Sequence, residues 1–186
     1  MFSKIASISF LLSILSFGMF YNTTNADSTR NIEQHFNGKE KIQVALLLDL
    51  SGSMDGLIEQ AKSRLWNIVN TMSTLKCKGE TPTLEIALYE YGKSNLPAKN
   101  HFIRQVLPFT KDLDLVSEML FSLRTNGGEE YCGAVIESAV QELNWQAGIS
   151  DLKLIYIAGN EPFNQGPISY AESVSKALQK SIYVNT

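Results

Sequence analysis

The stretch KIQVALLLDLSGS, residues 41–53, joins an apolar run to a polar turn. From Ile42 to Leu48 the residues are almost continuously apolar, a pattern typical of a strand that is buried on both faces of a parallel sheet. The run stops at Asp49, and Ser51-Gly52-Ser53 follows directly. We therefore expect a buried strand whose carboxyl end presents one carboxylate and two hydroxyl groups to the same side.

The rest of the chain alternates between strand and helix patterns. Apolar residues at helical spacing predict helices over residues 57–75, 112–121, 133–145 and 169–180. Shorter apolar runs predict strands over residues 84–91, 101–107, 152–158 and 182–184, the second of them ended by Pro108. This alternation predicts an α/β fold, a doubly wound, mostly parallel sheet with helices on both faces. Because a parallel sheet is usually covered on both faces and no helix follows the last strand, we expect the sequence to be truncated at its C-terminus.

The first 26 residues have the features of a secretory signal peptide. Lys4 precedes an apolar run from Ile5 to Phe20, and a short polar segment ends at Ala26. The run is shorter than the roughly 20 residues that a helix needs to cross a bilayer, and an uncleaved N-terminal anchor is the alternative interpretation. We expect cleavage after Ala26, a secreted or periplasmic protein, and no membrane span in the mature chain.

Composition indicates one folded domain behind this segment. The chain has 186 residues, of which 44% are apolar and 19% charged, values typical of a globular protein. Residues 27–40 are polar without an apolar period and are predicted to form a linker or mobile arm, so the domain spans residues 41–186. Cleavage removes Lys4 and no acidic residue, which changes the net charge from −3 to −4. Such a charge gives no reason to expect a nucleic-acid partner.

The polar loops of the predicted sheet indicate a metal site. Loops that follow parallel strands meet at one edge of a doubly wound sheet, where ligands bind. Asp49, Ser51 and Ser53 would place a carboxylate and two hydroxyls there, and Gly52 lets the backbone turn closely between the serines. Hard divalent cations such as Mg2+ prefer these oxygen ligands.

Asp-x-Ser-x-Ser, after an apolar first strand and before an amphipathic helix, resembles the metal-ion-dependent adhesion site (MIDAS) of von Willebrand factor type A (VWA) domains. The resemblance covers residues 41–186. Gly127-Gly128-Glu129 resembles the loop that supplies the family's next ligand, and Gly159-Asn160-Glu161-Pro162 resembles its last ligand loop. The resemblance implies a Rossmann-like VWA fold. It also implies a metal site drawn from Asp49, Ser51, Ser53, Glu129, Asn160 and Glu161.

Two positions depart from the family's pattern. Glu129 stands where the family usually has Thr, and Asn160 stands where it usually has Asp, so the count of carboxylates stays at two, from Asp49 and Glu129. Glu161 is an alternative to Asn160. The resemblance implies an adhesion or protein-binding module without catalytic residues, and the signal-peptide pattern implies that this module is exported. In such a module a partner's Asp or Glu carboxylate replaces a water on Mg2+, with Mn2+ and Ca2+ as alternative ions.

Two other interpretations remain open at this stage. Asp, Ser and Gly after a strand also occur in simple turns with helix-capping residues, which would make the domain a scaffold with a degenerate, empty site. An Asp at a strand end with Mg2+ could instead serve a phosphoryl-transfer hydrolase. That reaction needs a cation at the same edge, and Lys93 and Arg124 are the candidates, although neither lies in a motif.

The two cysteines, Cys77 and Cys132, are predicted not to pair with each other. Cys77 follows a helix of about 18 residues that carries the chain roughly 27 Å away from the site edge. Cys132 begins a helix back at that edge, whereas a disulfide needs Cα atoms within about 7 Å.

Overall fold

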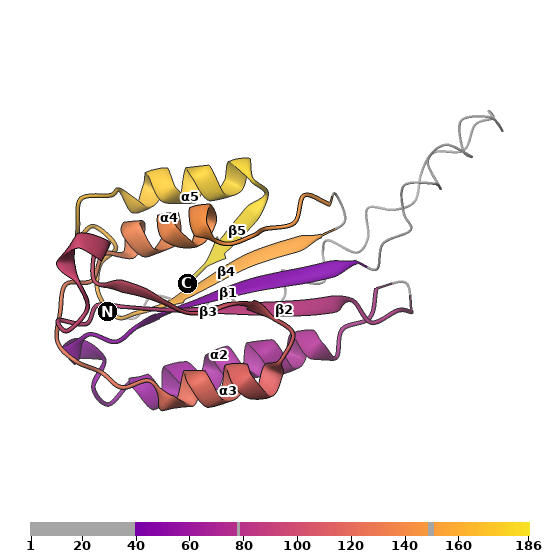
Figure 1. The fold of residues 1–186 in the computed structure, drawn as a ribbon, viewed down its shortest axis with the longest axis horizontal. Helices are drawn as coiled ribbons and strands as arrows, with labels where there is room; N and C mark the ends of the chain where they lie inside the picture. Colours follow the sequence, from indigo (N-terminus) through magenta and orange to yellow (C-terminus); the bar gives the residue numbers. More distant parts are fainter. Residues whose placement is uncertain (1–39, 78, 149–150) are drawn as a thin grey trace, which may run out of the picture. The chain divides into compact units, whose positions relative to one another are not determined.

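The computed structural model describes residues 40–186 except residues 78, 149 and 150. The predicted signal peptide and almost all of the predicted arm lie outside the described residues. The described part belongs to one compact unit, Lys39–Thr186. Its elements are, in chain order, β1 (Lys41–Asp49), the short helix η3 (Gly52–Met54), α2 (Ile58–Ser73), β2 (Thr83–Tyr91), the short helix η4 (Ala98–Asn100), β3 (Ile103–Thr110), α3 (Leu113–Ser122), α4 (Cys132–Glu142), β4 (Leu152–Ala158), α5 (Tyr170–Gln179) and β5 (Ile182–Asn185) (Figure 1).

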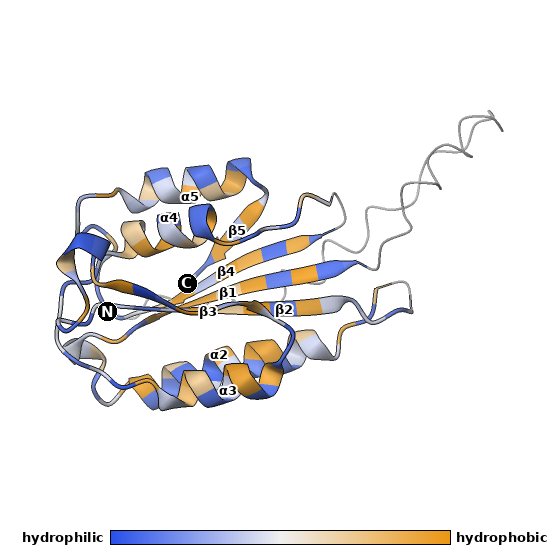
Figure 2. Ribbon diagram, in the orientation of Figure 1, coloured by the Kyte–Doolittle hydropathy of each residue, from blue (hydrophilic) through white to orange (hydrophobic). Residues whose placement is uncertain are grey.

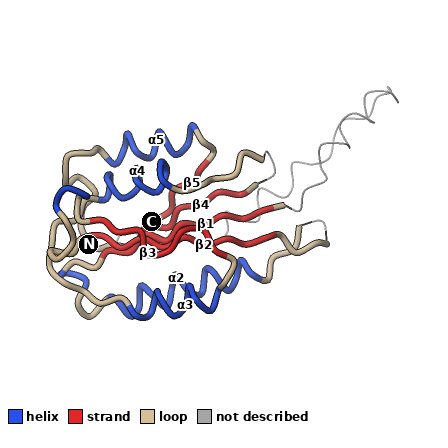
Figure 3. Tube along the Cα trace, viewed as in Figure 1, coloured by secondary structure: helices blue, strands red, loops and turns tan. Residues whose placement is uncertain are grey.

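The strands form one five-stranded sheet in the order β3-β2-β1-β4-β5. β1 pairs in parallel with both β2 and β4, and β4 pairs in parallel with β5, whereas β3 runs antiparallel to β2. Helices α2 and α3 lie on one face of the sheet and α4 and α5 on the other (Figures 1 and 3). This arrangement confirms the predicted α/β fold with a mostly parallel sheet.

The central strand explains the apolar run that opens the domain. Ala45 and Leu47 pack into the cluster beneath α4 and α5, and Val44, Leu46 and Leu48 pack into the cluster beneath α2 and α3. Because helices cover both faces, β1 has no polar alternation until it reaches the sheet edge. Figure 2 shows mainly apolar strands between helices that carry many hydrophilic residues.

The predicted end of the third strand is wrong. β3 runs through Pro108 to Thr110 rather than stopping at Leu107. Its pairing with β2 shifts register between the Leu88 and Ile86 positions, which is where the proline lies. β3 is also an edge strand, so a proline without an N–H group is tolerated at this irregularity.

The predicted helices are found, with ends that differ by a few residues. The largest difference is in α4, which ends at Glu142 instead of Trp145 because Leu143 adopts an extended conformation. Trp145 packs edge-on against Phe109 of β3, with ring centroids 4.8 Å apart.

The two cysteines lie at opposite ends of the sheet. Cys77 lies in a bridge with Glu80, before β2 begins, whereas the Cys132 sulphur is 3.5 Å from the hydroxyl of Tyr91, the last residue of β2. The nine residues of β2 extend over about 30 Å, so the predicted separation is confirmed. In the described residues, no helix is both long and apolar enough to cross a membrane.

The central strand supplies a direct test of this packing. Leu46 is fully buried, so Leu46→Ala leaves a cavity and should lower the free energy of unfolding by about 2–5 kcal/mol. Leu178→Ala on α5, where the side chain is 53% exposed, is the matched control and should cost less than about 1 kcal/mol. Urea denaturation measures both values, and equal losses would contradict the assignment of β1 as the core strand.

Candidate metal centre

The Asp49 carboxylate lies between the ends of the two strands that neighbour β1. Asp49 pairs with Tyr91 at the end of β2, and β4 ends one position earlier on the other side. Glycines follow both neighbouring strands. A Cβ atom at Gly92 would lie 2.7 Å from Asp49 Oδ1, and one at Gly159 would lie 3.1 Å from Asp49 Oδ2. The two glycines therefore leave the space that the carboxylate occupies.

Hydroxyl and amide oxygens continue from this carboxylate in a row. The Ser51 N–H donates to Asp49 Oδ1 at 2.8 Å, and the Ser51 and Ser53 hydroxyl oxygens are 2.9 Å apart. Ser53 Oγ donates to Asn160 Oδ1 at 2.9 Å, and Asn160 Nδ2 donates back to the Ser53 carbonyl at 3.1 Å. The structure thus brings together four of the six predicted site residues, three from the end of β1 and the turn that follows it and one from the loop after β4.

The carboxylate at the start of this row is buried. Asp49 is 1% exposed, and burial raises its pKa from 3.8 to about 6. The hydrogen bonds from Ser51 oppose the shift, whereas the nearby charges of Glu130 and Glu161 add to it. Among the described residues no ion pair involves Asp49. A buried carboxylate in such a setting favours a bound cation.

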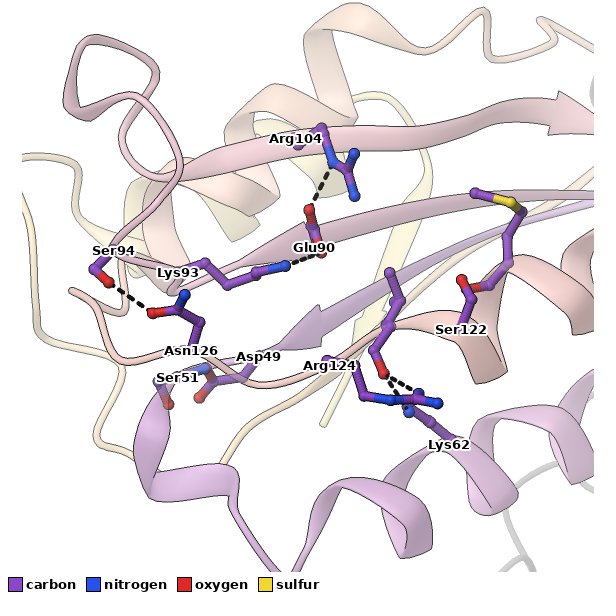
Figure 4. A network of polar contacts seen from close by, with 12 residues as sticks. Asp49, Ser51, Lys62, Glu90, Lys93, Ser94, Arg104, Ser122, Arg124 and Asn126 are labelled. Carbon is purple, nitrogen blue, oxygen red and sulfur yellow. Dashed lines mark hydrogen bonds and ion pairs between the residues drawn. The ribbon is translucent and has the colours of Figure 1, made fainter.

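A third loop, residues 123–131 between α3 and α4, is held at the same edge. The Asn126 N–H donates to the Leu50 carbonyl at 2.8 Å. The Ser94 hydroxyl donates to Asn126 Oδ1 at 2.8 Å, and the Ser94 N–H donates to the Gly127 carbonyl at 2.6 Å (Figure 4). A Cβ at Gly128 would lie 2.6 Å from the Gly92 carbonyl oxygen, so the close approach requires glycine. The loop is therefore fixed to the ends of β1 and β2.

The acidic residues of the loops differ in how close they come to Asp49. Glu129 is exposed and makes no hydrogen bond or ion pair in the part of the chain that is described. Glu130 is 8% exposed, accepts a hydrogen bond from Gln165 Nε2 at 2.9 Å, and raises the pKa of Asp49. Glu161 is half-buried and acts on Asp49 in the same direction. The sequence analysis considered Glu129 and not Glu130, although the two acids are adjacent and either could have been a candidate ligand from this loop.

The two basic candidates for an enzyme mechanism are engaged elsewhere. Lys93 Nζ lies 3.3 Å from Glu90 Oε2, and Arg104 of β3 shares the same carboxylate (Figure 4). Arg124 Nη1 donates to the carbonyls of Phe121 and Leu123 at 2.8 and 2.7 Å. Neither Lys93 nor Arg124 forms an ion pair with Asp49 in the described residues, and neither is among the groups that shift its pKa.

The donor set fits a hard divalent cation. It consists of one buried carboxylate, two hydroxyls and an amide oxygen, with further carboxylates nearby, and oxygen ligands of this kind suit Mg2+, Mn2+ and Ca2+. Within the described ranges, no group of three or more His, Cys, Asp and Glu side chains is arranged to hold a metal. Hydroxyl and amide oxygens would therefore have to complete the coordination.

Among known proteins, this chain is similar in fold to several solved structures. No protein-family model matches the chain, and no curated protein matches it. Among solved structures, proximal thread matrix protein 1 from the mussel byssus superposes with a TM-score of 0.58 at 13% identity, over 78% of this chain and 35% of that one. This chain has a VWA-like fold. A structure of the same mussel protein with a zinc-occupied MIDAS motif superposes with a TM-score of 0.55 at 11% identity over the same shares.

The likeness covers about a third of the mussel protein at low sequence identity. The chain spans 35% of the length of the mussel protein, and the identities lie far below those at which function is shared. The likeness therefore shows the architecture, and the chemistry of the site rests on the residues of this chain.

Neutralising Asp49 should stabilise the metal-free domain. A pKa raised from 3.8 to about 6 means that the folded state disfavours the ionised carboxylate, so stability is lost as pH rises through that window. Asp49→Asn keeps the acceptor for the Ser51 N–H and removes the charge. At pH 7.5 in excess chelator the free energy of unfolding of Asp49→Asn should exceed that of the wild type by about 1–3 kcal/mol. The difference should shrink toward zero near pH 4.

Urea denaturation at several pH values measures this difference. If Asp49→Asn destabilises the metal-free domain at pH 7.5, the buried charge is already balanced, and the case for a cation at this position is lost.

Proposed function

We propose that this chain is an exported protein-binding module that captures an acidic side chain of a partner through a divalent cation at Asp49, Ser51 and Ser53. The observation that carries the proposal is the buried Asp49 carboxylate, 1% exposed, which is followed by the oxygens of Ser51, Ser53 and Asn160 and forms no ion pair in the described residues. A protein gains nothing in stability from such an arrangement without an ion, so the arrangement favours a ligand-binding role.

The ligand set would combine four oxygen-bearing residues that already lie together with one of several nearby acids. Asp49, Ser51, Ser53 and Asn160 already form one row of oxygens. Glu161 lies on the same loop as Asn160, and Glu129 or Glu130 would supply the second carboxylate. Ser53 and Asn160 are exposed, which leaves the outer side of the site open to a partner. When bound, the cation would supply a Lewis-acid centre that accepts a carboxylate oxygen from the partner.

Mg2+ is the expected ion, with Mn2+ and Ca2+ as alternatives, because every donor is an oxygen. The mussel matrix protein has been observed with zinc in its MIDAS motif, which supports the proposal of a divalent ion but not a preference for Mg2+. Export is part of the proposal because the N-terminal segment has the pattern of a signal peptide. The byssal location of the mussel protein is compatible with this.

Binding is favoured over phosphoryl transfer by the positions of the basic side chains. A transferred phosphoryl group needs cations that stabilise its charge in the transition state. Lys93 is paired with the fully buried Glu90, and Arg124 is bound to backbone carbonyls. Neither side chain is positioned for a group bound next to Asp49.

Calorimetric titration of the purified domain with MgCl2 and MnCl2 tests the cation. One saturable site per chain is expected in the wild type, with at least a tenfold loss of affinity in Asp49→Asn. Glu118→Gln, which removes an exposed carboxylate on α3, is the matched control and should bind like the wild type. Wild-type protein that takes up no divalent ion would support the alternative of an empty scaffold, provided that circular dichroism shows it folded.

A second measurement tests the ligand class. Immobilised Gly-Ser peptides that carry a single Asp should retain the domain in Mg2+ and release it in excess chelator, because only a metal-bound carboxylate links the two. The matched peptide with Asn in place of Asp should not retain it. Retention by the Asp peptide that is unchanged in chelator would contradict a metal-mediated contact.

A further inference from the structure

A groove lies beside the first residues of β3, apart from the metal centre. Its volume is about 610 Å3. Three segments line it: the loop between β2 and β3, the start of β3, and one side of α4. The lining residues are Leu96, Pro97, Lys99, Asn100, His101, Ile103, Arg104, Gln105, Ser138 and Glu142. The floor of the groove therefore includes the start of an edge strand.

The two halves of the β3 edge differ in how well they are protected against pairing with another strand, and the half from Val106 to Thr110 is the protected one. Between Val106 and Thr110 the register with β2 shifts and Pro108 lacks an N–H group, both of which discourage an added strand. From Ile103 to Gln105 the pairing with β2 is regular. The groove lies along this regular half. The unprotected part of β3 is thus the part beside a space that could hold a ligand.

The main-chain groups of β3 in this half are oriented for pairing. The Gly92 N–H donates to the Phe102 carbonyl at 3.2 Å, immediately before β3 begins. In an antiparallel pair, hydrogen-bonded and non-hydrogen-bonded positions alternate. The main-chain groups of Ile103 and Gln105 therefore face away from β2, and no described strand lies on that side. Gln105 is exposed, so an extended peptide laid along the edge would reach its main chain, and Ile103 is 7% exposed because its side chain packs into the core.

The charges around the groove favour an acidic peptide. Lys99 is exposed and forms no ion pair among the described residues. Arg104 also lines the groove, and its guanidinium pairs with the buried Glu90 carboxylate, which Lys93 contacts as well (Figure 4). Glu142, the one acid of the lining, belongs to the α4 side and accepts a hydrogen bond from the Tyr89 hydroxyl at 3.2 Å. The β2–β3 side is thus basic in a chain whose net charge is −3.

We propose that the edge of β3 at Ile103–Gln105 binds a short extended peptide with an acidic side chain, which adds to the sheet as a sixth strand. Main-chain hydrogen bonds to Ile103 and Gln105 would supply the affinity, as in other cases of strand addition. Lys99 would select an acidic side chain at the end of the groove near the β2–β3 loop. The interaction needs neither Asp49 nor a cation, so it goes beyond the proposed function.

The test uses an eight-residue fluorescent peptide of alternating Val and Asp, titrated with the domain in excess chelator. Saturable binding is expected by fluorescence anisotropy. Gln105→Pro removes an N–H that faces away from β2 and should weaken binding at least tenfold, whereas Gln105→Ala keeps the N–H and should bind like the wild type. A peptide N-methylated at alternate residues should also bind at least tenfold more weakly.

Charge selection is tested with the same probe. Lys99→Glu should weaken binding about three- to tenfold, whereas Arg64→Glu, an equal charge change at an exposed position of α2, should leave it unchanged. No saturable binding by the wild type, or equal binding by Gln105→Pro and Gln105→Ala, overturns the proposal. Sedimentation shows whether the wild type dimerises and Gln105→Pro does not. That result would assign the edge to a second copy and also overturn it.

Discussion

Burial of the Asp49 carboxylate at the end of the central strand is the constraint on which the surrounding loops depend. The strand brings the carboxylate to the sheet edge, and the ends of β2 and β4 flank it there. Both neighbouring strands continue into glycine, since a Cβ at either position would meet the carboxylate. The Ser51 N–H and the row of hydroxyls then follow from the turn that the chain takes after Leu50. The site is therefore built from the sheet itself.

This constraint links the stability of the domain to its proposed function. A carboxylate with a raised pKa lowers the stability of the folded state at neutral pH, and the neighbouring charges of Glu130 and Glu161 increase the effect. A cation bound at the same place would reverse the sign of these contributions, because three destabilising charges would become ligands or close neighbours of a positive ion. The glycine contacts and the hydrogen bonds from Ser94 to the third loop hold these groups in position. The edge of β3 is independent of this chemistry, although the loop that carries Ser94 leads into its groove.

The sequence was informative where local pattern and global fold agree. The nearly continuous apolar run before Asp49 identified the central strand because both of its faces are covered. Ser51 and Ser53 follow directly from the end of that strand, whereas Asn160 was expected at the site because its loop resembles the last ligand loop of VWA domains. Pro108 misled the prediction because a proline usually ends a strand, and only the edge position and the register shift of β3 explain its presence. The choice between Glu129 and Glu130 depends on the direction of a loop that packs on Gly92 and Ser94 from distant parts of the chain. Spacing along the sequence does not encode that contact.

The central claim is that a divalent cation binds at the end of β1, and anomalous diffraction from crystals grown with MnCl2 tests it most directly. The account predicts one strong anomalous peak within about 2.0–2.4 Å of oxygens from Asp49, Ser51 and Ser53. The same crystals of Asp49→Asn should lack that peak. Wild-type crystals with no peak near Asp49, at a manganese concentration that saturates other oxygen sites, would contradict the account.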